Sequence, residues 1–367
     1  MSIISKRAQR FQSSGIRKVF DLAATLKNPI NFSIGQPDFG PSSIVQNATI
    51  NAIRENKSQY TPTQGILELR EKIVDKFRRE NNIPCSIDNV LITAGTSAGV
   101  FLSLAVLVDE EDEGLIPDPF FVEYPELVKF LGGKPVFINT YPSFQLDPKT
   151  IENACTEKTK VLIINSPNNP TGAVYSENTL RAIVDIARKK NLIVISDEIY
   201  EKFVYDKVHH FSIGSVYPNT ITRGGLSKSG GMPGWRLGWA TGPTEIIEKM
   251  KELQQYTFVC APSIVQYAAL SAIDDSIKKH VEEFQKRRDL VIELFSKKFS
   301  VIKPYGAFYM MVDVGDGDKF AEWAARQNVL VIPGSVFSTK KTHVRISYAL
   351  AKTKIIEGIN VLLKYPC

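Results

Sequence analysis

Short runs of β-branched apolar residues alternate with amphipathic segments of helical length from about Val90 onward, and this alternation restricts the fold more than any other feature. One example consists of the apolar run 161–165, the amphipathic segment 176–190 and the apolar run 192–196. This order predicts a strand, a crossover helix and a neighbouring parallel strand. Ser176 is the expected N-cap of the helix. We therefore expect an α/β fold with a mostly parallel sheet.

The length of the chain predicts more than one structural lobe. With 367 residues, of which 43% are hydrophobic, the chain has enough apolar material for two cores. The amphipathic pattern from Ser263 to Lys298 is expected to bridge to a smaller carboxyl-terminal lobe. Segments 307–312 and 343–348 are expected to form strands in that lobe.

Polar residues follow several of the predicted strands. Thr96 and Ser97 come soon after the strand 90–93, Asn169 follows the strand 161–165, and Asp197 follows the strand 192–196. Ligands of open α/β sheets bind outside the carboxyl ends of the strands. A ligand site is therefore expected where these polar residues converge.

Charge and cysteine usage exclude several classes of function. The net charge of +6 comes from short basic runs interleaved with apolar positions, a pattern typical of solvated helix faces and not of nucleic-acid binding. The four cysteines are far apart, so neither a metal site nor a disulfide framework is predicted, and a cytoplasmic location fits best. The charged amino terminus and the absence of any run of eighteen apolar residues predict no signal peptide and no membrane span.

An aspartate and a lysine stand out among the polar residues. Asp197 alone would more often be a helix N-cap, and a lysine in a glycine-rich loop such as Lys228 would more often be a surface residue. Here both occur in one chain, with Arg236 shortly after the lysine. Their combination favours a chemical site over either separate interpretation.

The order of the motifs resembles that of the class I and II aminotransferases, which are pyridoxal-phosphate (PLP) enzymes of fold type I. The resemblance covers almost the whole chain, in segments 33–39, 60–65, 69–70, 165–172, 196–200, 227–236 and 344–349. It implies a large domain with a mostly parallel seven-stranded sheet flanked by helices, plus a smaller α/β domain. The implied boundaries are 38–265 for the large domain, and 1–37 with 266–367 for the small domain and its amino-terminal arm.

The resemblance also assigns the catalytic residues, namely Lys228, Asp197 and Tyr200. Lys228 would hold PLP in a Schiff base and, once displaced by substrate, transfer a proton. Asp197 would keep the pyridine nitrogen protonated. Asn169 and Tyr200 would hydrogen-bond the phenolic oxygen of the cofactor.

Further residues are implied to bind the rest of the cofactor. Thr96 and Ser97, at the start of a helix, suit the phosphate, and Arg236 would pair with it. Phe121 would stack on the pyridine ring, with plain core packing as the alternative. Tyr60 resembles the tyrosine that reaches the phosphate of the neighbouring subunit, so a homodimer is expected.

The substrate carboxylate is assigned in the same way. Arg345 resembles the arginine that binds the α-carboxylate, Gly35 would let the backbone approach it closely, and Asn169 would also contact the substrate. One departure from the family pattern is Gly225, at a position that is often a phosphate-binding serine. Ser227 could supply the missing donor.

Amino-group transfer is the expected reaction, from an L-amino acid to a 2-oxo acid such as 2-oxoglutarate by a ping-pong route. The alternatives are a carbon–sulfur β-lyase on the same scaffold and a non-catalytic sensor domain, which would need an additional amino-terminal DNA-binding unit. Some aspartate-specific members of the family carry a lysine at the position of Ser97. We therefore expect an aromatic or other neutral donor, with aspartate as the second choice.

Overall fold

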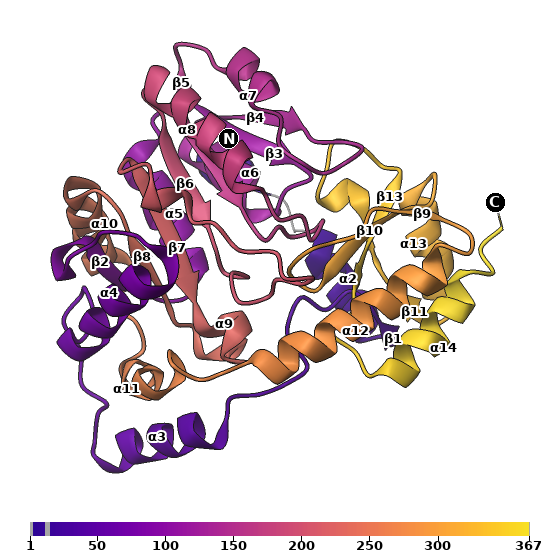
Figure 1. Ribbon diagram of the computed structural model, residues 1–367, viewed down its shortest axis with the longest axis horizontal. Coiled ribbons are helices and arrows are strands. Elements are labelled where there is room, and N and C mark those ends of the chain that lie inside the picture. Colours follow the sequence, from indigo (N-terminus) through magenta and orange to yellow (C-terminus); the bar gives the residue numbers. More distant parts are fainter. Residues whose placement is uncertain (1–2, 12–14, 367) are drawn as a thin grey trace.

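A computed structural model describes residues 3–11 and 15–366. Residues 1–2 and 12–14 of the expected amino-terminal arm, and Cys367, lie outside the described residues. A large, mostly parallel sheet forms one part of the molecule, and a smaller sheet with the carboxyl-terminal helices lies beside it (Figure 1).

The large sheet has seven strands in the order β2-β8-β7-β6-β5-β3-β4. β8 runs antiparallel to both of its neighbours, and every other pair is parallel. The mostly parallel seven-stranded sheet and the α/β fold class are therefore confirmed. The strands are β2 (Val90–Thr93), β3 (Glu113–Asp118), β4 (Lys134–Asn139), β5 (Thr159–Asn165), β6 (Ile193–Asp197), β7 (Thr220–Gly225) and β8 (Gly238–Thr241).

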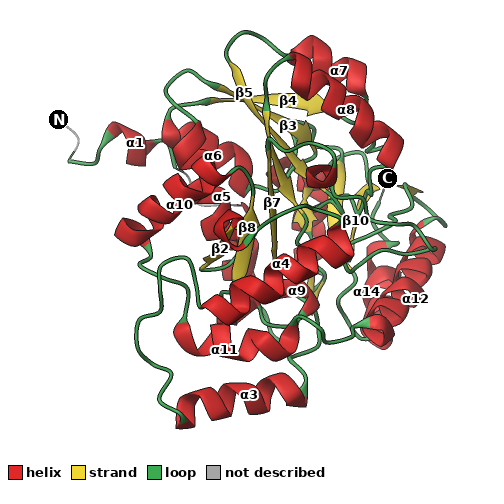
Figure 2. Ribbon diagram, turned by 60° about the vertical axis from the view of Figure 1, so that its left-hand side comes forward, coloured by secondary structure: helices red, strands yellow, loops and turns green. Residues whose placement is uncertain are grey.

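Helices cover both faces of this sheet (Figure 2). Alternate residues of one strand enter different cores, because side chains of a strand point to opposite faces. Ile163 packs with α5 and α10, whereas Leu162 packs with α8. The flanking helices include α4 (Leu67–Asn81), α5 (Thr96–Leu107), α6 (Glu123–Leu131), α7 (Pro148–Ala154), α8 (Glu177–Lys189) and α10 (Thr244–Thr257).

The predicted strand-helix-strand unit is present as β5, α8 and β6. The two strands pair in parallel, with Leu162 opposite Val194. Ser176 caps α8, since its Oγ accepts a hydrogen bond of 3.1 Å from the backbone N–H of Thr179. Burial on both faces explains why these strands are continuous apolar runs.

The smaller sheet has four antiparallel strands in the order β12-β13-β10-β9. They are β9 (Ser300–Val301), β10 (Tyr309–Asp313), β12 (Ile332–Pro333) and β13 (His343–Ser347), so both strands predicted in this region exist. A separate pair joins β1 (Ile30–Asn31) to β11 (Val329–Leu330) in parallel. The amino-terminal segment is thereby fixed to the carboxyl-terminal part of the chain.

The long amphipathic pattern from Ser263 to Lys298 forms two helices instead of one bridge. α11 (Ser263–Ala272) and α12 (Lys278–Phe295) are separated by a turn that contains Asp274, Asp275 and Ser276. These side chains compete for backbone hydrogen bonds and favour turns over helix interiors. α12 then runs toward the carboxyl-terminal helix α14 (Figure 1).

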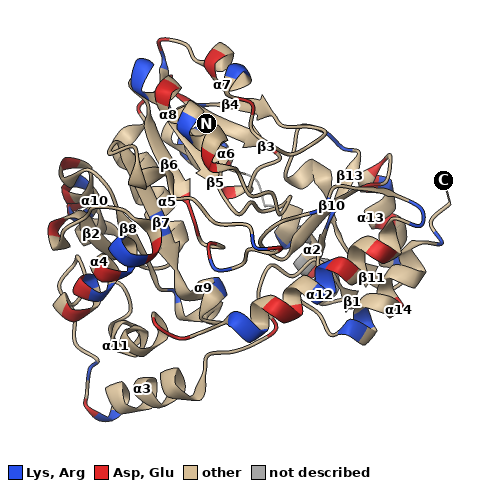
Figure 3. Ribbon diagram, in the orientation of Figure 1, with Lys and Arg blue, Asp and Glu red and all other residues tan. Residues whose placement is uncertain are grey.

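The remaining helices are shorter or peripheral. They are α1 (Lys6–Gln9), α2 (Gly15–Ala23), α3 (Ser43–Arg54), α9 (Leu226–Ser229), α13 (Gly317–Arg326) and α14 (Lys352–Leu362), with 3₁₀ turns at Ile87–Asn89, Ile213–Ser215, Pro233–Trp235 and Gly334–Val336. Acidic and basic positions interleave along α4 and α12 (Figure 3). Within the described ranges, no helix has both the length and the apolar character needed to cross a membrane.

Candidate active site

A cavity of about 300 Å³ opens at the carboxyl ends of β5, β6 and β7. Tyr309 on β10 and Arg345 on β13 line it from the smaller sheet, so the cavity lies between the two sheets. Every residue predicted for the site except Tyr60 lines this cavity: Gly35, Thr96, Ser97, Phe121, Asn169, Asp197, Tyr200, Lys228, Arg236 and Arg345. The sheet topology thus gathers residues that are far apart in the sequence.

Lys228 lies in α9, the single helical turn that follows β7. Its Nζ donates a hydrogen bond of 2.5 Å to the carbonyl oxygen of Gly35 and lies 5.6 Å from the centre of the Tyr200 ring. Burial, together with the charge of Arg345, lowers the pKa of Lys228 to about 8. The amine is therefore neutral in an appreciable fraction of molecules near neutral pH, as a nucleophile and proton acceptor requires.

Asp197 ends β6, and its side chain is buried. Oδ2 accepts a hydrogen bond of 2.7 Å from the Tyr124 hydroxyl, and Oδ1 accepts one of 3.3 Å from the backbone N–H of Ile199. Burial raises the pKa of Tyr124 well above its usual value, which keeps this hydroxyl a donor. A carboxylate held on both oxygens still has lone pairs for a donor in the cavity.

An anion-binding turn lies at the start of α5. Gly95 has a φ of +81°, and a Cβ built at this position would lie 2.3 Å from Nη2 of Arg236. The guanidinium of Arg236 therefore rests directly against the turn that carries Thr96 and Ser97. Free backbone N–H groups, hydroxyls and a guanidinium together are well suited to a phosphate.

The unexpected Gly225 has a steric explanation. A Cβ at this position would lie 2.8 Å from the carbonyl oxygen of Leu237, so a serine would require the backbone to move. Ser227 also lines the cavity, and its buried Oγ has no hydrogen-bond partner within the part of the chain that the structure describes. It is a free donor for an anion in the cavity.

Asn169, Tyr200 and Tyr309 also belong to the polar lining of the cavity. The hydroxyls of Tyr200 and Tyr309 are 2.9 Å apart, and burial raises the pKa of Tyr200 well above its usual value. The backbone N–H of Asn169 donates to Oδ1 of Asn165 over 2.8 Å. These contacts hold the two hydroxyls and the backbone of Asn169 in place.

Arg345 is buried, and its guanidinium is held in one orientation. Nη1 donates to Oδ1 of Asn169 over 3.1 Å, and Nη2 donates to the Ser33 carbonyl over 2.6 Å. The rings of Tyr309 and Phe337 lie against it, each with its centre 4.6 Å away. Nε has no hydrogen-bond partner in the described ranges. A substrate carboxylate could satisfy this atom.

Two predicted residues differ in their surroundings. Phe121 lines the cavity and meets Tyr124 edge to face, with ring centres 5.8 Å apart. Tyr60 is 85% exposed and lies outside the cavity of its own chain.

Sequence reasoning missed Tyr124 and Tyr309 as site residues. Two signals could have found them: Tyr124 comes three residues after Phe121, at the start of α6, and Tyr309 lies within a predicted strand.

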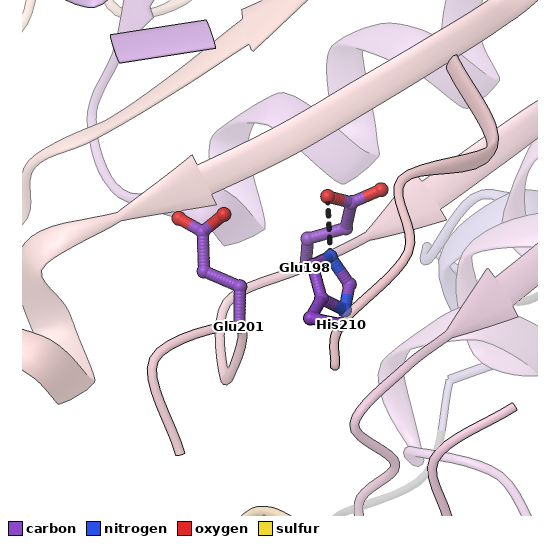
Figure 4. A group of neighbouring side chains, drawn as sticks. All are labelled: Glu198, Glu201 and His210. Carbon is purple, nitrogen blue, oxygen red and sulfur yellow. Dashed lines mark hydrogen bonds and ion pairs between the residues drawn. The ribbon is translucent and has the colours of Figure 1, made fainter. Parts of the chain in front are cut away.

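A second polar cluster, formed by Glu198, Glu201 and His210, lies close to Asp197 in the chain (Figure 4). His210 Nε2 is 2.8 Å from Oε2 of Glu198, and Lys76 Nζ is 2.5 Å from Oε1 of Glu201. Burial disfavours a charged His210, but the two carboxylates raise its pKa overall. Because Lys76 pairs with Glu201 and His210 hydrogen-bonds to Glu198, this cluster is a buried polar network that supports the segment after β6.

Comparison with known proteins gives the family. Residues 27–362 match the family model for aminotransferase class I and II. The chain belongs to this family. It is 38% identical to a probable aspartate aminotransferase of Methanocaldococcus jannaschii, covering 98% of this chain and 99% of the relative. It is also 38% identical to aromatic-amino-acid aminotransferase 2 of Thermococcus litoralis, covering 98% and 97%.

Solved structures agree with this assignment. A double mutant of Thermus thermophilus aspartate aminotransferase superposes with a TM-score of 0.95 at 34% identity, covering 99% of this chain and 100% of that one. An aromatic aminotransferase from Pyrococcus horikoshii gives a TM-score of 0.89 at 36% identity, covering 94% and 98%. These relatives are named as transaminases, which favours amino-group transfer over the lyase and sensor alternatives.

The protein is thus a PLP-dependent aminotransferase, and the residues of the cavity fit that cofactor. The turn at Gly95 and the free Ser227 hydroxyl suit the phosphate. Asp197 provides a carboxylate at the cavity wall, and Phe121 provides an aromatic face. Lys228 provides an amine with a lowered pKa for the covalent bond to the cofactor.

Proposed function

We propose that this aminotransferase transfers the amino group of a neutral or aromatic L-amino acid to a 2-oxo acid such as 2-oxoglutarate by a ping-pong route, with Lys228 as the residue that binds PLP and moves protons. One observation carries this proposal. Lys228, with a pKa lowered to about 8, lies in the same cavity as the Asp197 carboxylate and the Arg236 guanidinium.

Each part of the cofactor has a set of residues to hold it. Thr96, Ser97, Ser227 and Arg236 would bind the phosphate. Asp197 would accept a hydrogen bond from the protonated ring nitrogen, while Asn169 and Tyr200 would donate to the phenolic oxygen, and Phe121 would cover one face of the ring. Bound PLP supplies an electron sink for negative charge that develops at the substrate α-carbon.

The neutral Lys228 amine would take the proton from the substrate α-carbon and deliver it to the C4′ position of the cofactor. Its hydrogen bond to the Gly35 carbonyl shows that the ammonium form also has an acceptor within reach. Asp197 and Tyr200 act with it as catalytic residues, because both would contact the cofactor and hold its charges in place. The buried walls of the cavity would exclude water from these proton transfers.

Arg345 would bind the substrate α-carboxylate through its free Nε, with Gly35 and Asn169 beside it. A Cβ at position 35 would lie 3.1 Å from the Tyr309 hydroxyl, so a larger residue would crowd this part of the cavity.

We place the large domain at 38–265 and the small domain at 1–37 and 266–367. Binding of the carboxylate would then draw the two domains together, because Arg345 belongs to the small domain.

The charge of the cavity supports a neutral donor side chain. Of the described residues that line it, the cations are Lys228, Arg236 and Arg345, and each already has a proposed partner. Ser97 is uncharged, and its hydrogen-bond partner Glu123 supplies no cation for a second carboxylate. Aspartate as donor would leave a buried charge unpaired, which is costly.

A homodimer would explain the position of Tyr60. This residue is exposed between α3 and α4, and α3 projects from the body of the molecule (Figure 1). α3 carries exposed Ile44, Ile50 and Ile53. Exposed apolar residues on a projecting helix are typical of an interface. We infer that Tyr60 would reach the phosphate site of a partner subunit.

A cytoplasmic location is proposed from the separated cysteines. Cys85, Cys155 and Cys260 are free thiols. Reduced thiols are typical of a reducing compartment. Cell fractionation tests this location, and recovery of the protein in a secreted fraction would contradict it.

The first test concerns Lys228 and pH. Covalent uptake of PLP by the apoprotein should rise with pH and reach half of its maximum near pH 8, because only the neutral amine attacks the aldehyde. Lys228→Ala should abolish both this uptake and turnover. Absorbance changes followed across the pH range measure uptake, with the surface variant Lys202→Ala as control. A half-rise near about 10.4, the value of an ordinary lysine, would contradict the proposal.

The dimer can be tested with two kinds of hybrid. A dimer of one Tyr60→Phe chain and one Lys228→Ala chain should keep one intact site, because the Tyr60 of the second chain serves the Lys228 of the first. A wild-type chain paired with the double variant should lose that site. Activity at limiting PLP distinguishes the two hybrids. The reverse ranking would place Tyr60 in its own subunit, and fully active monomers in a sizing experiment would refute the dimer.

The donor preference can be measured as kcat/KM for phenylalanine, tyrosine, alanine, methionine and aspartate with 2-oxoglutarate as acceptor. Neutral or aromatic donors should equal or exceed aspartate. Cystathionine without 2-oxoglutarate is the control, since a carbon–sulfur β-lyase would release pyruvate from it without an acceptor. An aspartate value more than about tenfold above every neutral donor, roughly 1.4 kcal/mol in transition-state binding, would mean that another cation serves the distal carboxylate.

A further inference from the structure

Arg223 is a fully buried arginine in the middle of the large sheet. It lies on β7 directly opposite Asp197 on β6, as the parallel register of the two strands shows. Its side chain has an exposed fraction of 0% and passes beneath α5, where a Cβ at Gly99 would lie 3.4 Å from its Cδ. A charged group in this position needs a physical reason.

The guanidinium connects the two ends of the cofactor cavity. Nη1 donates a hydrogen bond of 3.1 Å to the carbonyl oxygen of Thr96, in the anion-binding turn. Nη2 lies 3.4 Å from Oδ2 of Asp197, which is close enough for an ion pair. Neither Nε nor Nη2 has a hydrogen-bond partner within the described ranges. The main partner of the charge is therefore the Asp197 carboxylate.

A purely structural role does not explain this arrangement. Burial of a guanidinium costs several kcal/mol unless charges and hydrogen bonds compensate it, and an apolar side chain of similar length would often be more stable. The neighbouring core residues Ile195 and Ile221 are apolar. Glu123, which lines the cavity, also interacts with this charge: burial raises the pKa of Glu123, and Arg223 acts in the opposite direction.

We propose that Arg223 is a positioning residue for Asp197, which it keeps ionised and oriented toward the ring nitrogen of the cofactor. The proposal rests on the role assigned to Asp197 above. Oδ2 would be fixed by Arg223 and Tyr124, so that Oδ1, which accepts only the backbone N–H of Ile199 among the described residues, keeps a lone pair for the cofactor. The bond to the Thr96 carbonyl would tie this orientation to the phosphate turn.

The physical basis is the cost of a buried negative charge. A carboxylate in an apolar environment tends to take up a proton, and a neutral aspartic acid holds a protonated ring nitrogen far less strongly. A fixed cation on the side away from the cofactor favours the ionised form without competing for the cavity. Arg223 would therefore strengthen cofactor binding through Asp197, although it does not line the cavity itself.

A double-mutant cycle on the full-length protein tests this inference. The variants are Arg223→Met, Arg223→Lys, Asp197→Asn and the combination of Arg223→Met with Asp197→Asn. Equilibrium binding of PLP to each apoprotein gives the affinity, and the ¹⁵N chemical shift of labelled PLP reports protonation of the ring nitrogen. Thermal unfolding of each apoprotein shows whether the fold is retained.

Arg223→Met should weaken PLP binding by about tenfold or more in the wild-type background and lower the protonation of the ring nitrogen. In the Asp197→Asn background the same change should have little effect on affinity, because the charge it supports is gone. Arg223→Lys should retain much of the affinity because it keeps a positive charge, and Arg223→Gln serves as the uncharged variant if the methionine variant does not fold. A lysine variant as weak as an uncharged one would overturn the proposal.

Two other outcomes would also overturn it, and they differ in what they imply. An equal loss of affinity in both backgrounds would mean that Arg223 acts through Thr96 and the fold, and not through Asp197. Asp197→Asn with unchanged affinity and nitrogen protonation would refute the role of Asp197 as well. Neither result would affect the assignment of Lys228, which rests on its own test.

Discussion

The parallel pairing of β6 with β7 is the constraint on which the whole site depends. It places Asp197 at the end of one strand and Arg223 opposite it on the next. β7 then ends within two residues of Arg223, and the single turn of α9 carries Lys228 over the same edge of the sheet. A shift of one residue in this register would turn Arg223 and Asp197 to opposite faces. The chemistry of the cavity therefore follows directly from strand register.

Charges in this cavity are buried, and each depends on the others. Burial lowers the pKa of Lys228, and the nearby guanidiniums lower it further, whereas Asp197 acts in the opposite direction. The guanidinium of Arg345 is held by Asn169 and Ser33, and that of Arg236 rests on the turn at Gly95. Side chains fixed in this way need little rearrangement when ligands bind, which is the basis of electrostatic preorganisation.

Much of the fold could be predicted because strands buried on both faces leave a clear apolar pattern, as in residues 161–165 and 192–196. Motif order located Lys228 and Asp197, and the structure brings them into one cavity. Tyr124, Tyr309 and Arg223 could not be found in this way, since their importance comes from contacts between distant segments. The turn at Asp274, which separates α11 from α12, was missed because the apolar periodicity continues on both sides of it. Tyr60 cannot be assigned to a site from one chain alone.

The central claim is that Lys228 is the residue to which PLP is covalently bound. Reduction of the purified holoprotein with borohydride fixes the cofactor on its lysine, and mass spectrometry of the proteolytic peptides then locates it. We expect the added mass on the peptide that contains Lys228, and loss of the label when substrate amino acid is added before the reduction. Label on any other lysine, such as Lys76 or Lys202, would contradict the claim and with it the proposed mechanism.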